Sequence, residues 1–570
     1  MENLDIGRIF EEVADLLEIQ SANPFRVRAY RTAARTVEAQ SVPVALLVDE
    51  EGALEELPGI GKDLAEKIRE IVRTGELALL RELRAQTPPG LAEMMHISGL
   101  GPKRAKQIYD ELQIATLDDL EAAAREGRLQ ELHGFGPTLE AKVIQGLAEH
   151  RARAGRFRLA DADAYVRPLL AYLEKVEGIE TLEVAGSYRR RCETVGDVDI
   201  LIAAKDGGPI AEQFVAYPQV AEVLAQGATK SSVRLKAGLQ ADLRIVPPES
   251  WGAALHYFTG STAHNIAVRR MGVKRKLKIN EYGVFRGDRR VGGRTEAEVY
   301  AAVDLPYIPP ELREDRGEFE AARDGTLLDL VTPDDIRGDL QMHTTRSDGR
   351  NTLEEMVLAC RARGYAYAAI TDHTQAVRVA GGLDAAAFRE QFREIDRLQD
   401  RLDDFRILKS AEVDILDDGT LDLDDDTLAA LDLVVVSVHS KFNLTKAQMT
   451  RRVVRALRHP RTRIFGHPTG RILGRREPYP LDLEEVVKAA LEHNVALEVN
   501  AQPDRLDLND IHVRMARDAG APIVISTDAH RIEELDFMRY GVDQARRGWC
   551  EAKHVWNALP LADLLARVGG

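Results

Sequence analysis

The sequence predicts a multidomain protein with a helical N-terminal part, an α/β middle part and a C-terminal β/α barrel. Turns that contain glycine, each followed by an amphipathic helix, repeat within residues 1–155. Strand-like and helix-like segments mix from residue 156 to 250. From residue 337 onward, short hydrophobic runs typical of buried parallel strands alternate with helical stretches. The 570 residues are enough for about three to five domains, each with its own core.

Composition and charge are ordinary for a globular protein and give no sign of a membrane protein. No apolar run approaches the ~20 residues that cross a bilayer, and the N-terminus lacks the basic and apolar regions of a secretory signal. The three cysteines are far apart in sequence and make neither a zinc spacing nor a disulfide framework, which favours a reducing cytoplasm. The net charge of −16 by itself argues against nucleic acid as a partner.

Two basic segments nevertheless offer local sites for phosphates. Four arginines fall between residues 151 and 158, and six cations fall within residues 269–278. Local basic stripes can bind phosphates even on an acidic protein. We interpret Lys274, Arg275 and Lys276 as contacts to DNA, and the alternative is a solvated cationic face.

The N-terminal repeat has three copies, at residues 54–72, 94–112 and 129–147, and each places a G-x-G turn before an amphipathic helix. Glycine permits positive φ and close backbone approach, and the amides at a helix start can hold a phosphate. The copies fit the helix-hairpin-helix motif, which contacts the DNA backbone without reading sequence. The alternative is a tight αα-turn without a ligand. The glycines expected at DNA are Gly59, Gly61, Gly99 and Gly101.

Two aspartates mark a candidate metal site in the middle part. Asp197 and Asp199 lie two positions apart on an apolar strand, so both side chains point to one face. Carboxylates this close repel each other unless a cation lies between them, and Asp242 on a second strand could complete the set. Mg²⁺ binds to a few carboxylates plus substrate phosphates. Two such ions can activate a 3′-hydroxyl and stabilise a leaving pyrophosphate.

The turn Gly186-Ser187-Tyr188-Arg189-Arg190 supplies cations suited to a triphosphate. Together with the aspartates it resembles the palm of family X DNA polymerases, relatives of DNA polymerase beta in the nucleotidyltransferase superfamily. The turn at residues 257–261, Y-F-T-G-S, is similar to the family's sugar-contacting turn. The resemblance implies a DNA polymerase that uses Mg²⁺ or Mn²⁺, with Asp197, Asp199 and Asp242 as catalytic metal ligands. It places Gly186, Ser187, Arg190, Tyr257, Phe258, Gly260 and Asn265 at the nucleotide and Arg269 at the DNA.

The likeness has two departures and one extension. The family's aspartate beside the base is Thr262 here, and Arg191 stands where the animal enzyme has glycine. The first hairpin also resembles the family's lyase domain, in which Lys67 takes the position of the Schiff-base lysine. A lysine attacks an abasic-site aldehyde when its pKa is lowered, and the alternative is a solvated helix lysine.

Metal-ligand residues end the hydrophobic runs of the C-terminal part. The runs cover residues 338–343, 365–373, 406–415, 431–439, 462–468, 495–500 and 521–530. The polar residues at or near their ends are His343, Asp372, His373, Glu412, His439, His467, Asp528 and His530, whereas the run 495–500 offers only Asn500. In β/α barrels the chemistry lies at the C-terminal ends of the strands. Histidine, aspartate and glutamate converging there indicate a multi-metal hydrolytic site.

These motifs resemble the PHP (polymerase and histidinol phosphatase) domain, which implies a distorted, TIM-like barrel of seven strands. The order of the two halves resembles that of bacterial family X polymerases over nearly the whole chain. The resemblance implies up to three Mn²⁺ or Zn²⁺ ions, held by His343, Asp348, His373, Glu412, His439, His467, Asp528 and His530. The family's opening H-x-H is Gln341-x-His343 here. Glutamine offers a metal only a neutral oxygen, so one metal position is expected to be weak, empty or filled by a harder ion.

We therefore expect a bacterial, cytoplasmic, monomeric DNA polymerase that acts on gapped or primed DNA and dNTPs in repair. The PHP domain would add a 3′-5′ exonuclease and an AP endonuclease activity. The rival hypotheses are a nuclease whose palm only holds DNA ends, and a DNA-end scaffold without activity. The expected domains are a lyase-like helix-hairpin-helix domain (1–80), helix-hairpin-helix fingers (81–155), a nucleotidyltransferase palm (156–250), a thumb-like nucleotide-selection domain (251–315), a linker (316–336) and the PHP domain (337–570).

Overall fold

A computed structural model of the chain describes residues 3–569 except 21, 39–43, 45–46, 49–51, 75, 88–90, 92–93, 95–96, 98–99, 115, 133, 155, 443 and 474–475. The chain divides into two compact units, Met1–Gly155 and Arg156–Gly570, and each is described by itself. No helix in the described ranges is both long enough and apolar enough to cross a membrane.

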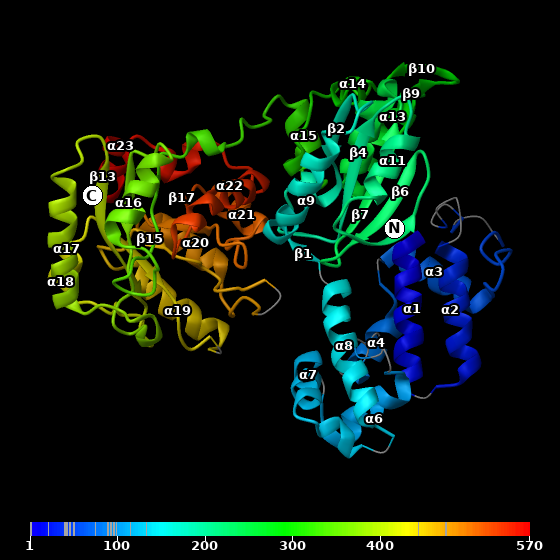
Figure 1. Cartoon of the computed structure of the whole chain (residues 1–570), viewed down its shortest axis with the longest axis horizontal. Helices are drawn as coiled ribbons and strands as arrows, with labels where there is room; N and C mark the ends of the chain where they lie inside the picture. The colour runs from blue at the N-terminus through cyan, green and yellow to red at the C-terminus, as the bar shows by residue number, and fades with distance from the viewer. Residues whose placement is uncertain are drawn as a thin grey trace. The chain divides into compact units, whose positions relative to one another are not determined.

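The first unit is helical, as predicted. Its helices are α1 (Asn3–Ile19), α2 (Pro24–Glu38), α3 (Lys62–Thr74), α4 (Ala78–Gln86), α6 (Pro102–Leu112), α7 (Leu117–Arg125), η2 (Arg128–Glu131) and α8 (Pro137–Ala154). Helices α1 and α2 lie side by side (Figure 1). Helix α3 buries Leu64, Ile68 and Ile71, which share one face because they are three to four positions apart. Two separate hydrophobic clusters form, one around α1–α4 and one around α6–α8.

The second unit begins with a five-stranded mixed sheet in the order β2-β4-β7-β6-β5. Val198, Ile200 and Ile202 of β4 pack in the same cluster as the helices α9 and α11, while Leu201 points to the opposite face, against α12. This alternation leaves the carboxylates of β4 on the less covered face of the sheet. The elements are β1 (Phe157–Arg158), α9 (Leu159–Leu173), β2 (Thr181–Val184), α10 (Gly186–Arg189), β3 (Thr194–Val195), β4 (Asp197–Ala203), α11 (Gly208–Val215), β5 (Val220–Ala225), β6 (Lys230–Leu235), β7 (Gln240–Val246), η3 (Pro248–Ser250) and α12 (Trp251–Thr259).

A small antiparallel sheet, in the order β10-β9-β8, follows with its own helices. The elements are α13 (Thr262–Lys274), β8 (Lys278–Asn280), β9 (Gly283–Arg286), β10 (Arg289–Gly292), α14 (Glu296–Ala301), η4 (Pro310–Leu312), α15 (Glu318–Arg323) and η5 (Pro333–Asp335). The acidic stretch predicted as a linker, 316–336, thus contains a helix. Phe319, Ala322 and Leu330 of that stretch are buried in the cluster of this sheet, and Trp549 from the far end of the chain joins them.

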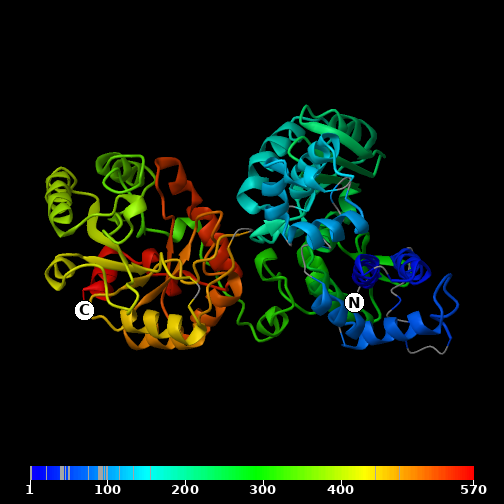
Figure 2. The ribbon, with the colours of Figure 1, turned by 90° about the horizontal axis from the view of Figure 1, so that it is seen from below.

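Seven parallel strands form the C-terminal sheet in chain order, β11 to β17, which confirms the predicted seven-stranded fold. An isolated parallel bridge between Met342 and Ala529 joins the two edge strands just past their ends, so the sheet nearly closes into a barrel. Figure 2 shows helices of this part around its strands, while Leu564 and Val568 near the C-terminus share a hydrophobic cluster with Leu408 and Val435 of the strands. The strands are β11 (Gly338–Asp339), β12 (Tyr367–Ile370), β13 (Arg406–Asp414), β14 (Leu433–Ser437), β15 (Ile464–Phe465), β16 (Ala496–Asn500) and β17 (Ile523–Ser526).

The barrel helices follow the strands as the alternation of hydrophobic runs predicts. They are α16 (Leu353–Ala362), η6 (Arg378–Ala380), α17 (Ala385–Gln399), α18 (Asp425–Ala429), α19 (Lys446–Leu457), α20 (Leu483–Glu492), α21 (Asp510–Ala519), η7 (Ile532–Phe537), α22 (Met538–Arg547), η8 (Ala552–His554), η9 (Trp556–Ala558) and α23 (Leu561–Val568). Several begin at side-chain caps, such as Thr352 before α16 and Asp384 before α17. The strands are almost fully buried, as expected for a parallel sheet covered by helices.

Candidate functional site

Three carboxylates meet on neighbouring strands of the five-stranded sheet. Strands β4 and β7 are parallel, and their register pairs Asp199 with Asp242. Burial raises the pKa of Asp199 to about 7, and the charges of Asp197 and Asp242 add to the rise. Burial and then Asp242 also raise the pKa of Asp197. The three carboxylates therefore carry more negative charge than the neighbouring side chains balance. This electrostatic environment suits a divalent cation.

A glycine turn packs directly against these acids. Gly186 has φ of +64°, and a Cβ built on it would lie 3.0 Å from Oδ2 of Asp199. Any larger residue would displace the carboxylate, so this position requires glycine on both counts. Gly186 and Ser187 open the short helix α10, and Arg190 follows its end. The predicted triphosphate turn and the acids thus lie in contact.

Arg190 reaches across to the second predicted turn. Its Nη1 donates to the carbonyl of Thr259, and its Nε lies 3.0 Å from Oε1 of Glu314. A Cβ on Gly260 would lie 3.0 Å from Nη1 of Arg190, so Gly260 leaves room for the guanidinium. The side chain of Arg190 is 15% exposed, which leaves part of it open to a ligand.

The aromatic residues at the end of α12 are held by the following helix. The rings of Tyr257 and Phe258 contact edge to face, 5.1 Å apart. Nδ2 of Asn265 donates to the carbonyl of Tyr257 at 2.7 Å, and the guanidinium of Arg269 lies 6.0 Å from the Tyr257 ring. Of the predicted nucleotide-binding residues, the structure therefore places Tyr257, Phe258, Gly260 and Asn265 at one turn, with Arg190 in contact with it. Asn265 supports that turn through its amide.

The predicted DNA contacts lie on turns and at the surface. Gly59 has φ of +81° in the turn before α3, and a Cβ there would meet Cγ2 of Thr32 at 2.9 Å. Gly61 precedes α3, and Gly101 is the N-terminal cap of α6. Gly99 lies outside the described residues. In the basic stripe, Lys274 and Lys276 are exposed, and Arg275 is exposed but pairs with Asp304 at 2.8 Å.

Lys67 lies on α3 and is held locally. Its Nζ forms an ion pair with Asp63, one helical turn earlier, and the lysine side chain is 18% exposed. The amine therefore has a carboxylate partner at the place that the lyase resemblance assigns to a nucleophile.

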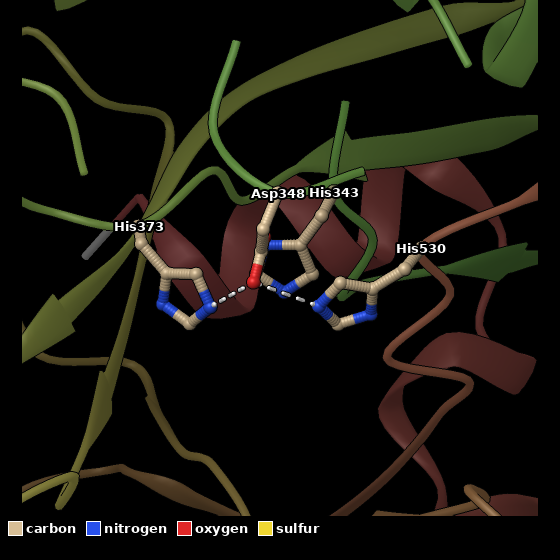
Figure 3. A group of neighbouring side chains, drawn as sticks. All are labelled: His343, Asp348, His373 and His530. Carbon is tan, nitrogen blue, oxygen red and sulfur yellow. Dashed lines mark ion pairs between the residues drawn. The ribbon is translucent and has the colours of Figure 1, made fainter. Parts of the chain in front are cut away.

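In the barrel, the structure brings the ligand-type residues together at the C-terminal ends of the strands. Among the described residues, three groups have ligand atoms within 4.8 Å of one another, and all three lie in the barrel. They are His343/Asp348/His373/His530, His373/Glu412/His439 and His343/Glu412/Asp528. In the first group, shown in Figure 3, Oδ2 of Asp348 lies 3.5 Å from Nε2 of His373 and 3.4 Å from Nε2 of His530.

Glu412 links the groups from the end of β13. Its Oε1 lies 2.9 Å from Nε2 of His467 and 3.4 Å from Nε2 of His439, and its Oε2 lies 3.4 Å from Nε2 of His343. Burial opposes ionisation, but His373 and His439 hold the pKa of Glu412 well below its ordinary value. Burial lowers the pKa of His439 in turn, yet Glu412 and then Asp414 raise it overall to about 9. Glu412 is thus an ionised carboxylate surrounded by imidazoles, which is a donor set that suits Mn²⁺ or Zn²⁺.

Buried polar atoms without partners support the fit to metal ions. Within the part of the chain that the structure describes, Nδ1 of His343, Nδ1 of His467 and both polar atoms of the Gln341 amide have no hydrogen-bond partner. Gln341 is fully buried, and a Cβ on Gly466 would meet its Oε1 at 3.3 Å. Buried polar atoms normally have partners, so the unpartnered amide oxygen of Gln341 is available as a donor to an ion.

The sequence reasoning missed Glu498, which lies on β16. From the sequence, the run 495–500 offers only Asn500. Glu498 is fully buried and accepts hydrogen bonds from the amide of His467 at 2.6 Å and from Nδ2 of Asn500 at 3.2 Å. Burial, together with the charges of Asp528 and Glu412, raises its pKa well above the ordinary value. Its position two residues before Asn500 was the available signal, because period two places both on one strand face.

Asp372 and Asn500 form hydrogen bonds at or next to the ligand-type residues. Asp372 accepts from the amide and the hydroxyl of Thr344, at 2.8 and 2.7 Å, and so fixes the loop after His343. Nδ2 of Asn500 donates to Oδ2 of Asp528 at 3.0 Å. Asn500 therefore orients Asp528 directly, and Asp372 fixes the loop next to His343; such supporting contacts are common around metal sites.

Known protein families match the helical N-terminal part, the middle part and the C-terminal barrel of the chain. Five family descriptions match: "Helix-hairpin-helix domain" (1–77), "SAM-like Helix-hairpin-helix tandem" (91–149), "DNA polymerase beta palm" (160–274), "DNA polymerase beta thumb" (254–314) and "PHP domain" (339–502). The chain is 40% identical over 571 residues to the DNA polymerase/3′-5′ exonuclease PolX of Bacillus subtilis (strain 168), which covers 99% of each chain.

Two further relatives match one part each. The chain is 26% identical to DNA polymerase lambda of Rattus norvegicus over 345 residues, which is 55% of this chain and 56% of the relative. It is 27% identical to a probable phosphatase of Syntrophotalea carbinolica over 215 residues, which is 36% of this chain and 85% of the relative.

Proposed function

Because the chain belongs to the bacterial family X DNA polymerases with a C-terminal PHP domain, we propose that it fills short gaps in DNA during repair. The same protein shortens 3′ ends with its barrel and incises DNA at abasic sites there. The observation that carries the polymerase function is the pairing of Asp199 with Asp242 on adjacent strands, in contact with the turn of Gly186 and Arg190.

In the palm, the primer 3′-oxygen forms a bond to the α-phosphorus of the dNTP, and pyrophosphate leaves. Asp197, Asp199 and Asp242 would hold Mg²⁺ or Mn²⁺, which supplies positive charge for phosphoryl transfer. Asp242 takes up the proton of the 3′-hydroxyl. Arg190 binds the triphosphate through its guanidinium, and the turn at Tyr257 and Phe258 carries the sugar.

In the barrel, water adds to the phosphorus of the terminal phosphodiester, and the upstream 3′-oxygen leaves. The nine ligand-type residues would hold Mn²⁺ or Zn²⁺, which would act as a Lewis acid for that attack. Glu412 would hold metal together with several histidines, because its two oxygens face different imidazoles. The ligand-type residues are Gln341, His343, Asp348, His373, Glu412, His439, His467, Asp528 and His530.

The N-terminal unit would hold the DNA through its glycine turns, and Lys67 would remove an abasic sugar after release from Asp63. We propose a monomer in the bacterial cytoplasm, with gapped or primed DNA and dNTPs as its substrates.

One experiment separates the proposal from its rivals. A gapped DNA with a labelled primer is incubated with Mn²⁺, with and without dNTPs. The proposal predicts extension with dNTPs and shortening without them. Shortening alone would favour a barrel nuclease whose palm only holds DNA ends, and an unchanged primer would favour a scaffold without activity.

A further inference from the structure

An arginine of the barrel is buried against the candidate nucleotide site of the palm. Arg547 is the last residue of α22, and its side chain is 7% exposed. Its Nη1 donates to the backbone carbonyl of Arg190 at 2.8 Å. The palm and the barrel belong to one compact unit, and Trp549, two residues later, is buried in the cluster of the small antiparallel sheet. The contact is therefore part of a packed interface.

Arg547 also shares the carboxylate that pairs with Arg190. Oε1 of Glu314 lies 3.0 Å from Nε of Arg190 and 3.1 Å from Nη1 of Arg547. The second Arg547 nitrogen, Nη2, lies 2.8 Å from Oδ2 of Asp510, which pairs with Arg316 at 2.9 Å. Arg190 and Arg547 thus share Glu314, and Arg547 and Arg316 share Asp510, so three arginines pair with two carboxylates in this network.

The presence of two arginines on Glu314 affects how strongly Arg190 can attract a bound triphosphate. A carboxylate paired with Arg190 alone would neutralise the cation that the phosphates need. Because Arg547 pairs with the same oxygen, it offsets part of the negative charge of Glu314. Glu314 then neutralises Arg190 less, and the Arg190 guanidinium attracts a phosphate more strongly. The hydrogen bond to the Arg190 carbonyl fixes the backbone from which the guanidinium extends.

We propose that Arg547 is a positioning residue for nucleotide addition, through which the barrel holds Arg190 ready for the triphosphate of a dNTP. The inference rests on the proposed polymerase function of the palm. Arg547 acts through Arg190 and Glu314, so it affects binding of the dNTP more than the reacting atoms. The barrel would then be a structural part of the polymerase site as well as a separate enzyme.

The test uses full-length protein and steady-state kinetics of dNTP addition to a gapped DNA. Arg547→Met should raise the KM for dNTP about tenfold. The loss of a charged hydrogen bond costs about 1.4 kcal/mol, which corresponds to a factor of ten. The kcat should change less than about threefold, and 3′ shortening should persist. Arg546→Met is the matched control: Arg546 is on the same helix and pairs with Glu311 at 2.8 Å, so its loss should leave the KM unchanged.

A second variant tests the sharing of charge. In Glu314→Gln combined with Arg547→Met, no carboxylate remains to neutralise Arg190, and the KM should return toward that of the wild type. Should Arg547→Met fail to fold, Arg547→Lys keeps one cation but not both contacts, and its KM should rise less, by about threefold.

Three outcomes would overturn the inference: an unchanged KM when Arg547 is replaced, an equal rise with Arg546→Met, or a double variant no better than the single one. Wild-type protein that adds no nucleotide at all would instead refute the proposed polymerase function, and the inference with it.

Discussion

Replacement of Asp199 by asparagine should abolish nucleotide addition and, at the same time, stabilise the cation-free palm. Burial, then Asp197 and Asp242, raise the pKa of Asp199 from 3.8 to about 7. The folded protein therefore holds this proton more tightly than the unfolded chain, and the folded state loses stability as the pH rises from about 4 to 7. Each step of one in pKa corresponds to about 1.4 kcal/mol, so the charge costs on the order of 4 kcal/mol at pH 8.

The assay measures both effects on one protein. In EDTA at pH 8, hydrogen exchange of β4 and β7 should be slower in Asp199→Asn than in wild type, and at pH 4 the two should be alike. Primer extension with Mg²⁺ should be undetectable, while 3′ shortening by the barrel continues. Asp288→Asn, at an exposed turn, should change neither property. A variant that exchanges as fast as wild type at pH 8, or that extends a primer normally, would refute the assignment of this carboxylate.

Three further predictions concern the barrel and the basic stripe. His373→Ala should stop 3′ shortening but not extension, because His373 belongs to two of the three ligand groups; shortening at the wild-type rate would exclude it as a ligand. Gln341→His should raise the metal content after dialysis, since imidazole binds Zn²⁺ and Mn²⁺ better than an amide; equal or lower occupancy in parallel preparations would contradict this. Lys274, Arg275 and Lys276 changed together to glutamine should flatten the salt dependence of DNA binding, by about 0.9 in slope for each phosphate that is no longer neutralised; an unchanged slope would return the stripe to a solvated surface.

Features set by residues that are close together along the chain could be predicted from the sequence. The period of two places Asp197 and Asp199 on one strand face, and the alternation of apolar runs with helices predicts the seven barrel strands. In the structure the ligand-type residues lie near the strand ends: His373 follows Ile370, His439 follows Ser437, and Glu412 lies inside β13, two residues before its end. Local pattern sufficed because successive parallel strands bring their ends to the same rim.

Glu498 marks the first limit of this reasoning. A glutamate inside an apolar run indicates an exposed position, because charged side chains are seldom fully buried. The closed arrangement of the strands shows that this face of β16 points to the ligand cluster, where the backbone amide of His467 and Nδ2 of Asn500 donate hydrogen bonds to the carboxylate.

The interface between palm and barrel marks the second limit. An acidic, weakly apolar stretch at residues 316–336 indicates a linker, yet Phe319 and Leu330 pack in the same cluster as Trp549. Arg547 and Arg190 are 357 positions apart, and an arginine at a helix end is expected at the surface when only its neighbours are considered. Burial of Trp549 fixes the end of α22 against the polymerase part, and this brings Arg547 to Glu314. Because the two parts share buried charges as well as apolar contacts, removing the barrel would leave Glu314 paired with Arg190 alone, and the palm would lose a component of its own site.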